Sequence, residues 1–159
     1  MIAIDPGTLE SAVVEWDGSK IGVCAILPNH DLVEHILYRW GTRDIVIERF
    51  ACYGMPVGEE SIATILWTGR MIQAHKDAPD RHKHNPASTS LIYRREVKMH
   101  ICQQAKAKDS NIIQALKDRF GAKSKTNPIT GKLKADMWQA FALAVTAIEN
   151  PELVRTGRI

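Results

Sequence analysis

The chain begins Met1-Ile2-Ala3-Ile4-Asp5-Pro6-Gly7-Thr8, an apolar run that ends on an acid and is followed by a Pro-Gly turn. Two further apolar runs, at about 11–17 and 20–27, flank the dipeptide Asp17-Gly18. An Asp-Gly pair between apolar runs is typical of a β-hairpin. The opening of the chain therefore predicts three short antiparallel strands, the first of which ends at Asp5.

The rest of the chain alternates helical and strand patterns. Leu32, Val33, Ile36 and Leu37 have helical spacing, and Gly41 follows as a stop signal. By the same reasoning we expect helices at 30–40, 58–75, 96–104, 110–120 and 135–149, strands at 45–50 and 91–93, and loops at 77–90 and 121–134. There is no internal repeat, so residues 1–159 are expected to form a single domain.

Composition is typical of a soluble globular protein. The chain has 159 residues, of which 45% are hydrophobic and 25% are charged. No apolar run approaches the roughly 20 residues of a membrane span, and the N-terminus does not resemble a signal peptide. Three unpaired-looking cysteines indicate a reducing compartment. We expect no membrane partner and a cytoplasmic location, in a bacterium or a phage-infected host cell.

Positive charge concentrates in the second half of the chain. The net charge is only +3, but residues 94–134 hold eleven lysines and arginines against three acids. Such a stretch suits a protein that binds a phosphate backbone. The alternative is a solvated helical surface with uneven charge.

Three acids lie where strands end or a helix begins. Asp5 ends the first strand, Glu48 follows Ile45-Val46-Ile47, and Asp136 opens the alanine-rich helix. A buried acid without a partner is costly, so acids at these positions indicate a site for divalent cations. The alternatives are a solvated turn for Asp5, an ion pair for Glu48 and a favourable helix-end charge for Asp136.

Four segments in order resemble the active-site segments of RuvC-type Holliday junction resolvases, members of the ribonuclease H-like superfamily. They are Ile4-Asp5-Pro6-Gly7-Thr8, Ile47-Glu48, Tyr93–Lys98 continuing to Gln104–Lys108, and Ala135–Ala144. The resemblance implies an α/β ribonuclease H-like fold with a central mixed five-stranded sheet, its first three strands antiparallel, flanked by helices. It also implies one nuclease domain over residues 1–159.

The resemblance further implies the activity. Members of the family are homodimeric endonucleases that resolve four-way DNA junctions by symmetric paired nicks, using two Mg²⁺ ions per site, for which Mn²⁺ often substitutes. In such a site one ion activates water and the other stabilises the leaving oxygen. By this resemblance Asp5 bridges both ions, Glu48 serves one of them, and Asp136 reaches in from the last helix.

One position departs from the family pattern. Where the family has a second acid on the last helix, this chain has Gln139. Residues 136 and 139 share a helix face, so Gln139 is expected to point at the same ions. Its amide oxygen can ligate a hard cation, but it brings no charge and cannot act as a base. We expect an active enzyme with three essential carboxylates and Gln139 as a neutral ligand.

The resemblance also suggests DNA contacts. Lys98, Lys106 and Lys108 match family lysines near the scissile phosphate, and we assign Lys98 and Lys106 a catalytic role in neutralising developing charge. The alternative for each is an ordinary surface lysine. Further DNA-binding candidates are Lys132, Lys134, Arg49 and Tyr53, the last as a residue that stacks on an unpaired base.

Two other functions remain open from the sequence. One is a flap, branched-DNA or RNA–DNA hybrid nuclease of the same fold, because a fold does not fix the substrate. The other is a junction-binding protein with weakened catalysis, which Gln139 suggests. His82 and His84 have no cysteine partner nearby and are interpreted as solvated loop residues.

Overall fold

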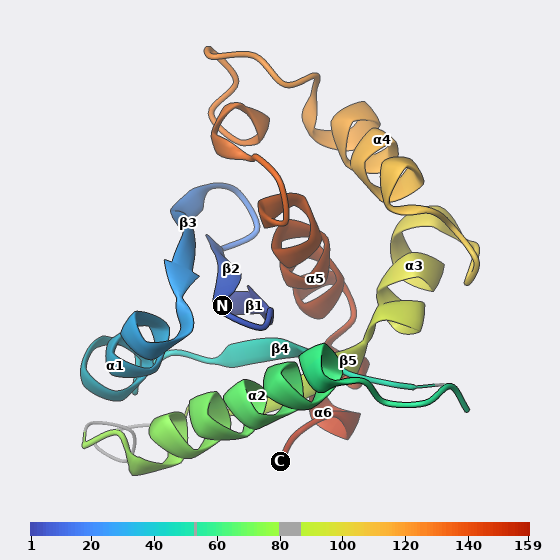
Figure 1. Ribbon diagram of the computed structural model, residues 1–159. Coiled ribbons are helices and arrows are strands. Elements are labelled where there is room, and N and C mark those ends of the chain that lie inside the picture. The colour runs from blue at the N-terminus through green and yellow to red at the C-terminus, as the bar shows by residue number, and fades with distance from the viewer. Residues whose placement is uncertain (53, 80–86) are drawn as a thin grey trace.

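A five-stranded mixed sheet lies between two layers of helices in the computed structural model, which describes residues 1–52, 54–79 and 87–159 (Figure 1). The strands are β1 (Ile2–Asp5), β2 (Glu10–Trp16), β3 (Ile21–Pro28), β4 (Ile45–Arg49) and β5 (Thr89–Tyr93), in the order β3-β2-β1-β4-β5. The pairs β1–β2 and β2–β3 are antiparallel, whereas β1–β4 and β4–β5 are parallel. The expected mixed sheet with an antiparallel opening is confirmed.

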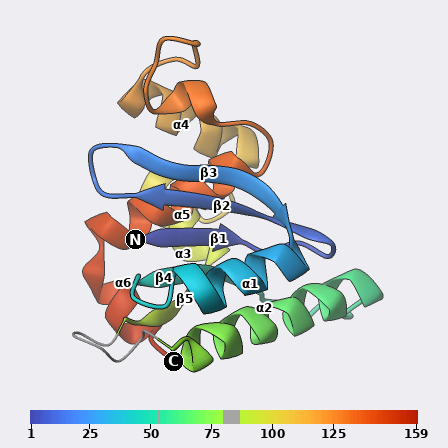
Figure 2. The same cartoon turned by 90° about the vertical axis from the view of Figure 1, so that its left-hand side faces the viewer.

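The helices divide between the two faces of the sheet (Figures 1 and 2). Their bounds are α1 (Asn29–Arg39), α2 (Glu59–Asp77), α3 (Arg94–Cys102), α4 (Asp109–Phe120), α5 (Met137–Glu149) and α6 (Pro151–Thr156), with a 3-10 turn, η1, at Thr130–Lys132. α1 and α2 pack on one face, and α3, α4 and α5 pack on the other. In the described part of the chain, no helix is long and apolar enough to cross a membrane.

Side-chain alternation along β1 and β4 decides which face each residue joins. Ile4 and Ile47 are buried against α1 and α2, whereas Ala3 and Val46 belong to the core beneath α5. Successive side chains of a strand point to opposite faces, so Asp5 and Glu48 come out on the α5 side. β1 and β4 are parallel and pair Ile4 with Ile47, so both acids lie at the carboxyl ends of these neighbouring strands.

Helix α5 is the central helix of that layer. Every residue from Met137 to Ala147 is buried, which is the pattern of a helix surrounded on all sides by protein. Phe141 lies edge-on to Trp16 and Phe120, with ring centroids 5.2 and 5.1 Å away. This packing fixes the start of α5 close to the ends of β1 and β4, and hence fixes where Asp136 and Gln139 lie.

Some element ends differ from the sequence-based expectation. α3 begins at Arg94 rather than at residue 96, and β5 begins at Thr89 rather than at residue 91. α5 begins at Met137, so Asp136 precedes its first helical residue. Asn150-Pro151 ends α5 as expected but also opens α6, because proline is well tolerated in the first turn of a helix.

The C-terminal residues close one edge of the sheet. Leu91 N–H donates to the Gly157 carbonyl at 2.9 Å, and Ile159 N–H donates to the Thr89 carbonyl at 3.1 Å. Ser90 and Arg158 form an isolated antiparallel bridge between these two bonds. β5 therefore has a backbone partner on its outer side as well as on its β4 side.

Candidate active site

The turn after Asp5 is held by a small buried network. Asn29 Nδ2 donates to the Gly7 carbonyl at 3.0 Å, and Gly7 N–H donates to Ser11 Oγ at 3.2 Å. Ser11 Oγ in turn donates to Asn29 Oδ1 at 2.6 Å. A side chain at residue 7 would collide with the Glu10 carbonyl, so glycine is required there. These contacts fix the direction in which the chain leaves Asp5.

Asp5 and Glu48 are partly buried carboxylates at the ends of neighbouring strands. Burial, and then the neighbouring Glu48 carboxylate, raise the pKa of Asp5 from its ordinary 3.8 to about 8. Burial also raises the pKa of Glu48, although Arg94 opposes that rise. A pair of close, desolvated acids is an unfavourable arrangement unless a cation balances it.

Arg94 supplies part of that balance. Its Nη1 donates to Glu48 Oε2 at 2.8 Å, and its Nη2 lies 2.9 Å from Asp109 Oδ1. Lys98 Nζ lies 3.9 Å from the same Asp109 oxygen. Although burial works against it, Glu48 and Asp109 raise the pKa of Arg94. We call Asp5, Glu48, Arg94 and Asp109 the acid site.

Asp136 stands at the border of the acid site. Its side chain is exposed and makes no capping bond to α5, yet its charge is among those that raise the pKa of Asp5. The preceding residue, Ala135, has φ of 43°, in the left-handed region that residues other than glycine seldom adopt. The strained turn presents Asp136 at the helix start, where a negative charge is favoured.

Gln139 is placed differently from Asp136. It is 7% exposed, and its Oε1 atom is buried without a hydrogen-bond partner. A buried oxygen without a donor is uncommon and costs free energy. This oxygen is one turn into α5, on the side of the helix that carries Asp136.

The donor set bears on the expected metal. Within residues 1–52, 54–79 and 87–159, no group of three or more His, Cys, Asp and Glu side chains lies close enough to hold an ion. Two partly buried carboxylates with raised pKa values, an acid nearby and an unsatisfied amide oxygen are nevertheless hard oxygen donors that a divalent cation would satisfy. The residues present fit such a cation, provided that Arg94 releases Glu48.

Basic residues gather beside the acid site. A cavity of about 500 Å³ is lined by Arg94, Arg95, Lys98, Ala105 and Lys106, and we call it the basic cavity. Two of the predicted contacts, Lys98 and Lys106, are thus brought together next to Arg94. Lys108 is exposed at the residue before α4.

The remaining predicted DNA contacts lie elsewhere. Lys132 and Lys134 are exposed and lie near Cys24 of β3, whose Sγ is 3.9 Å from the Lys132 carbonyl oxygen. Arg49 points to the opposite side of the sheet from Glu48 and lies over the Tyr93 ring, 4.6 Å from its centroid. Tyr53, like His82 and His84, falls outside the described residues.

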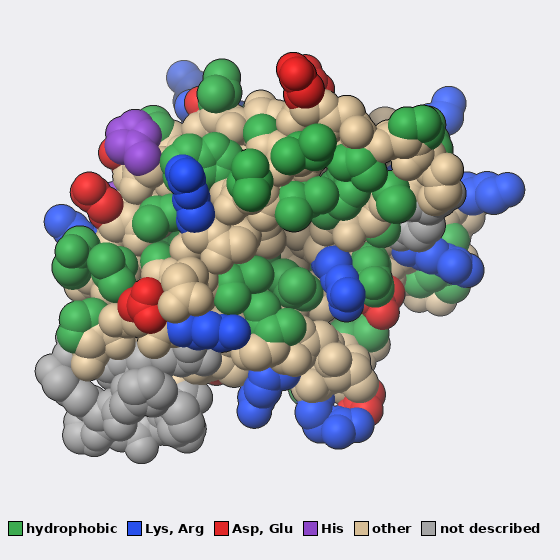
Figure 3. Space-filling model, turned by 60° about the horizontal axis from the view of Figure 1, so that its bottom comes forward, with side chains coloured by type: hydrophobic (Ala, Val, Ile, Leu, Met, Phe, Trp, Pro, Cys, Tyr) green, Lys and Arg blue, Asp and Glu red, His purple; other side chains and the backbone are tan. Residues whose placement is uncertain are grey.

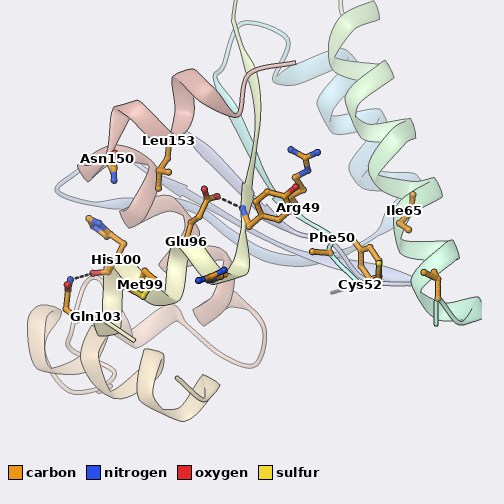
Figure 4. Close-up of a pocket in the computed structure, with 14 residues that line it drawn as sticks. Arg49, Phe50, Cys52, Ile65, Glu96, Met99, His100, Gln103, Asn150 and Leu153 are labelled. Atoms are coloured by element: carbon orange, nitrogen blue, oxygen red, sulfur yellow. Dashed lines mark hydrogen bonds between the residues drawn. The ribbon is translucent and has the colours of Figure 1, made fainter. Parts of the chain in front are cut away.

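A larger hollow of about 1090 Å³ lies beyond the ends of β4 and β5 (Figure 4). We call it the large cavity, and its lining includes Arg49, Phe50, Ala51, Cys52, Val57, Ile65, Tyr93, Arg95, Glu96, Met99, His100, Gln103, Asn150 and Leu153. Phe50 and Ile65 lie at one end, and Asn150 and Leu153 lie at the other. The lining combines apolar side chains with two arginines, the acid Glu96 and His100.

Sequence reasoning missed Arg94 and Asp109 as members of the site. One signal was available: Arg94 and Arg95 occupy the first turn of α3, where the helix dipole disfavours positive charge. Arginines at a position that the helix dipole disfavours indicate a nearby partner of opposite charge. The contact of Arg94 with Glu48, 46 positions away, depends on the pairing of β4 with β5.

No protein-family model and no curated protein sequence matches the chain. Solved structures do. An RuvC structure from Thermus thermophilus matches with a TM-score of 0.68 at 15% identity, covering 99% of this chain and 98% of that one. The chain has the RuvC fold. T. thermophilus RuvC in complex with Holliday junction substrate matches with a TM-score of 0.67 at 14% identity and the same coverage.

The RuvC fold accounts for the whole described architecture, from the antiparallel opening to the α5 layer. The resemblance inferred from four short segments therefore extends to the three-dimensional structure. At 14–15% identity the likeness establishes the fold. What the site does has to be argued from its own residues.

Proposed function

We propose that this protein is a metal-dependent endonuclease that resolves four-way DNA junctions. The observation that carries the proposal is the pair Asp5–Glu48, two partly buried acids at the carboxyl ends of neighbouring strands, with the basic cavity beside them. The acids would bind divalent cations, and the lysines and arginines would bind phosphate. A site that cleaves a phosphodiester requires both. The fold shared with an RuvC that binds a Holliday junction supports the choice of substrate.

The residues of the site divide the work. Asp5 and Glu48, with Asp136 from the start of α5 and the Gln139 oxygen, would hold Mg²⁺ or Mn²⁺. Such ions supply an activated water and stabilise charge on the leaving oxygen. Asp5 must first lose the proton that its raised pKa favours. Lys98 and Lys106 hold the backbone phosphate and offset its developing charge.

Symmetric cleavage requires two sites, and we propose that a second copy supplies the other. Apolar side chains are spread over the face that carries α1 and α2 (Figure 3). In and before α2, three apolar residues that do not line the large cavity are 48–72% exposed: Met55, Ile62 and Leu66. Exposed apolar side chains this close together are typical of protein–protein interfaces.

A second candidate function is junction binding with weak catalysis. Two observations favour it: Arg94 already pairs with Glu48, and the neutral Gln139 stands where the resembling family has an acid. Both lower the attraction of the site for cations. Cleavage of the junction decides between the two functions.

The experiment is cleavage of a mobile synthetic four-way junction, with matched duplex, flap and RNA–DNA hybrid substrates, in Mg²⁺ or Mn²⁺. We expect paired nicks at symmetric positions on the junction and none on the duplex. Asp5→Asn, purified in parallel, controls for contaminating nucleases. Cleavage of the hybrid or flap alone would replace the junction as substrate, and junction binding without nicks would favour the second candidate.

A further inference from the structure

Arg94 faces two sites at once. On one side its guanidinium pairs with Glu48 Oε2 at 2.8 Å and Asp109 Oδ1 at 2.9 Å. On the other side it forms part of the wall of the basic cavity, with Arg95, Lys98 and Lys106. Arg94 therefore belongs to both the acid site and the basic cavity, and Lys98 of the cavity also lies near Asp109.

The bond between Arg94 and Glu48 is partly shielded from water. The side chains of Arg94 and Glu48 are 28% and 15% exposed, so their attraction is stronger than that of an ordinary surface pair. A divalent cation at Glu48 and the guanidinium of Arg94 would both seek the same carboxylate. The divalent cation and the guanidinium are both positive and repel each other when both are close to Glu48. Binding of one at this carboxylate therefore weakens binding of the other.

Asp109 gives Arg94 a second anchor. It is the first residue of α4, its side chain is 57% exposed, and it contacts both Arg94 and Lys98. An arginine that leaves Glu48 can keep its bond to Asp109, because the fork of a guanidinium presents donors in two directions. Asp109 thus remains available to Arg94 as an acidic partner when Glu48 is not.

The basic cavity offers an alternative partner for the guanidinium. All four ionisable residues that line it are cationic, and Arg94 and Arg95 stand in the first turn of α3, where the helix dipole adds positive potential. Asp109 offsets part of the charge of Arg94 and Lys98, and an anion in the hollow would reduce the remaining repulsion among the four cations. A phosphodiester matches this chemistry, since arginine and helix N-termini both bind phosphate oxygens.

We propose that Arg94 is exchanged between two ligands: it is the counter-ion of Glu48 in the metal-free protein, and it binds a DNA backbone phosphate in the basic cavity once Glu48 holds a divalent cation. The inference rests on the proposed function and deepens it. Because one side chain serves both ligands, cation and DNA each favour binding of the other, and this coupling is reciprocal.

The first test measures Mn²⁺ binding to the protein without DNA, by calorimetric titration. Arg94→Met removes the competing guanidinium and is expected to bind Mn²⁺ about fivefold more tightly than the unaltered chain. Arg95→Met is the matched control, since it removes a neighbouring charge that has no bond to Glu48, and we expect a change of less than about twofold. Asp109→Asn is expected to weaken Mn²⁺ binding, because Arg94 then has Glu48 as its remaining acidic partner.

The signs of these changes separate exchange from a purely structural role. If Arg94 merely held Glu48 in place, Arg94→Met would bind Mn²⁺ more weakly, and that result, or equality with Arg95→Met, overturns the proposal. Thermal unfolding followed by circular dichroism checks each variant. Should Arg94→Met fail to fold, Arg94→Lys replaces it, because an ammonium lacks the fork that spans Glu48 and Asp109. It too must bind Mn²⁺ more tightly than the unaltered chain.

The second test measures the coupling itself. The affinity of each protein variant for a fluorescent four-way junction is measured by anisotropy with and without Ca²⁺. The increase in affinity that Ca²⁺ causes is then compared between variants. The gain should be smaller in Arg94→Met than in Arg95→Met, whereas equal gains would contradict the exchange. These outcomes are distinct from failure of the proposed function: normal junction cleavage with equal Mn²⁺ affinities rejects only the exchange, and the expected Mn²⁺ order without cleavage rejects only the resolvase.

Discussion

The acid site and the large cavity both adjoin the ends of β4 and β5, but the arginines in them have different partners. In the acid site, Arg94 is bound to two carboxylates, of which Glu48 is partly buried and Asp109 is exposed. In the large cavity, Arg49 lies over the ring of Tyr93 and is exposed. Glu48 and Arg49 are consecutive residues, so one step along a strand separates a site suited to chemistry from a surface suited to contact.

The largest difference between the two sides is expected in catalysis. Asp5→Asn removes a carboxylate of the acid site and should lower the single-turnover nicking rate of a four-way junction by about 1,000-fold or more. Arg49→Gln, on the other side, should lower it by less than about tenfold. Comparable losses in the two variants would show that the division between the two sides is wrong.

A second difference concerns stability and pH. The folded pKa of Asp5, about 8, lies above its unfolded value of 3.8. Protonated Asp5 therefore contributes stability that is fully present below about pH 4 and is lost as the pH rises through about 8. In EDTA, the free energy of unfolding should fall over this range, and Asp5→Asn should be more stable than the unaltered chain at pH 9, by about 2 kcal/mol or more.

Asp17→Asn is the matched control for that measurement. Asp17 accepts bonds from Lys20 N–H and Ser19, which lower its pKa to about 2. Its stabilising contribution is present above the ordinary value and lost below it, the reverse of Asp5, so Asp17→Asn should give no gain at pH 9. A gain in both variants would trace to net charge rather than to burial at the acid site.

A substitution in the large cavity should change the affinity for the junction rather than the nicking rate. Phe50 is 37% exposed on its wall, and a base that stacks on it would lose that contact in Phe50→Ala. We expect about fivefold weaker junction binding, measured by anisotropy in Ca²⁺, with little change in the nicking rate at saturating protein. Tyr38→Ala, on α1 and 70% exposed, controls for loss of a surface aromatic.

The smallest expected change concerns Gln139 and the Mg²⁺ concentration that nicking requires. Gln139→Asp places a charge at the buried, unsatisfied oxygen of α5. It should lower the Mg²⁺ concentration for half-maximal nicking by about threefold, because a charged ligand holds a hard cation better than an amide does. An unchanged Mg²⁺ midpoint would show that residue 139 does not face the ion.

The order of strands and helices could be predicted from the sequence because each element carries its own pattern. The Asp17-Gly18 turn marks the hairpin, and Leu32 and Ile36 mark α1. The same patterns placed Asp5 and Glu48 at strand ends, and the parallel pairing of β1 with β4 brings those ends together. These features depend on local periodicity and on the general rules of sheet formation.

The partners of the acids could not be predicted in the same way. Arg94 reaches Glu48 because β5 pairs with β4 and α3 starts at once after Tyr93. The sequence alone suggested a later start of α3, since arginines in a first turn are unfavourable and carry no start signal. Likewise, no local sequence pattern predicts the left-handed backbone of Ala135, which precedes the exposed Asp136.

The backbone bonds that Leu91 and Thr89 make with the C-terminal residues have a consequence for how the protein behaves in solution. An unpaired outer strand is a template on which strands of other molecules can add, and this is a common route to aggregation. Here Gly157 and Ile159 occupy that row of donors and acceptors themselves. The short C-terminal segment thus blocks strand addition at the outer side of β5. It does not cover the carboxyl ends of β4 and β5, where a ligand can bind.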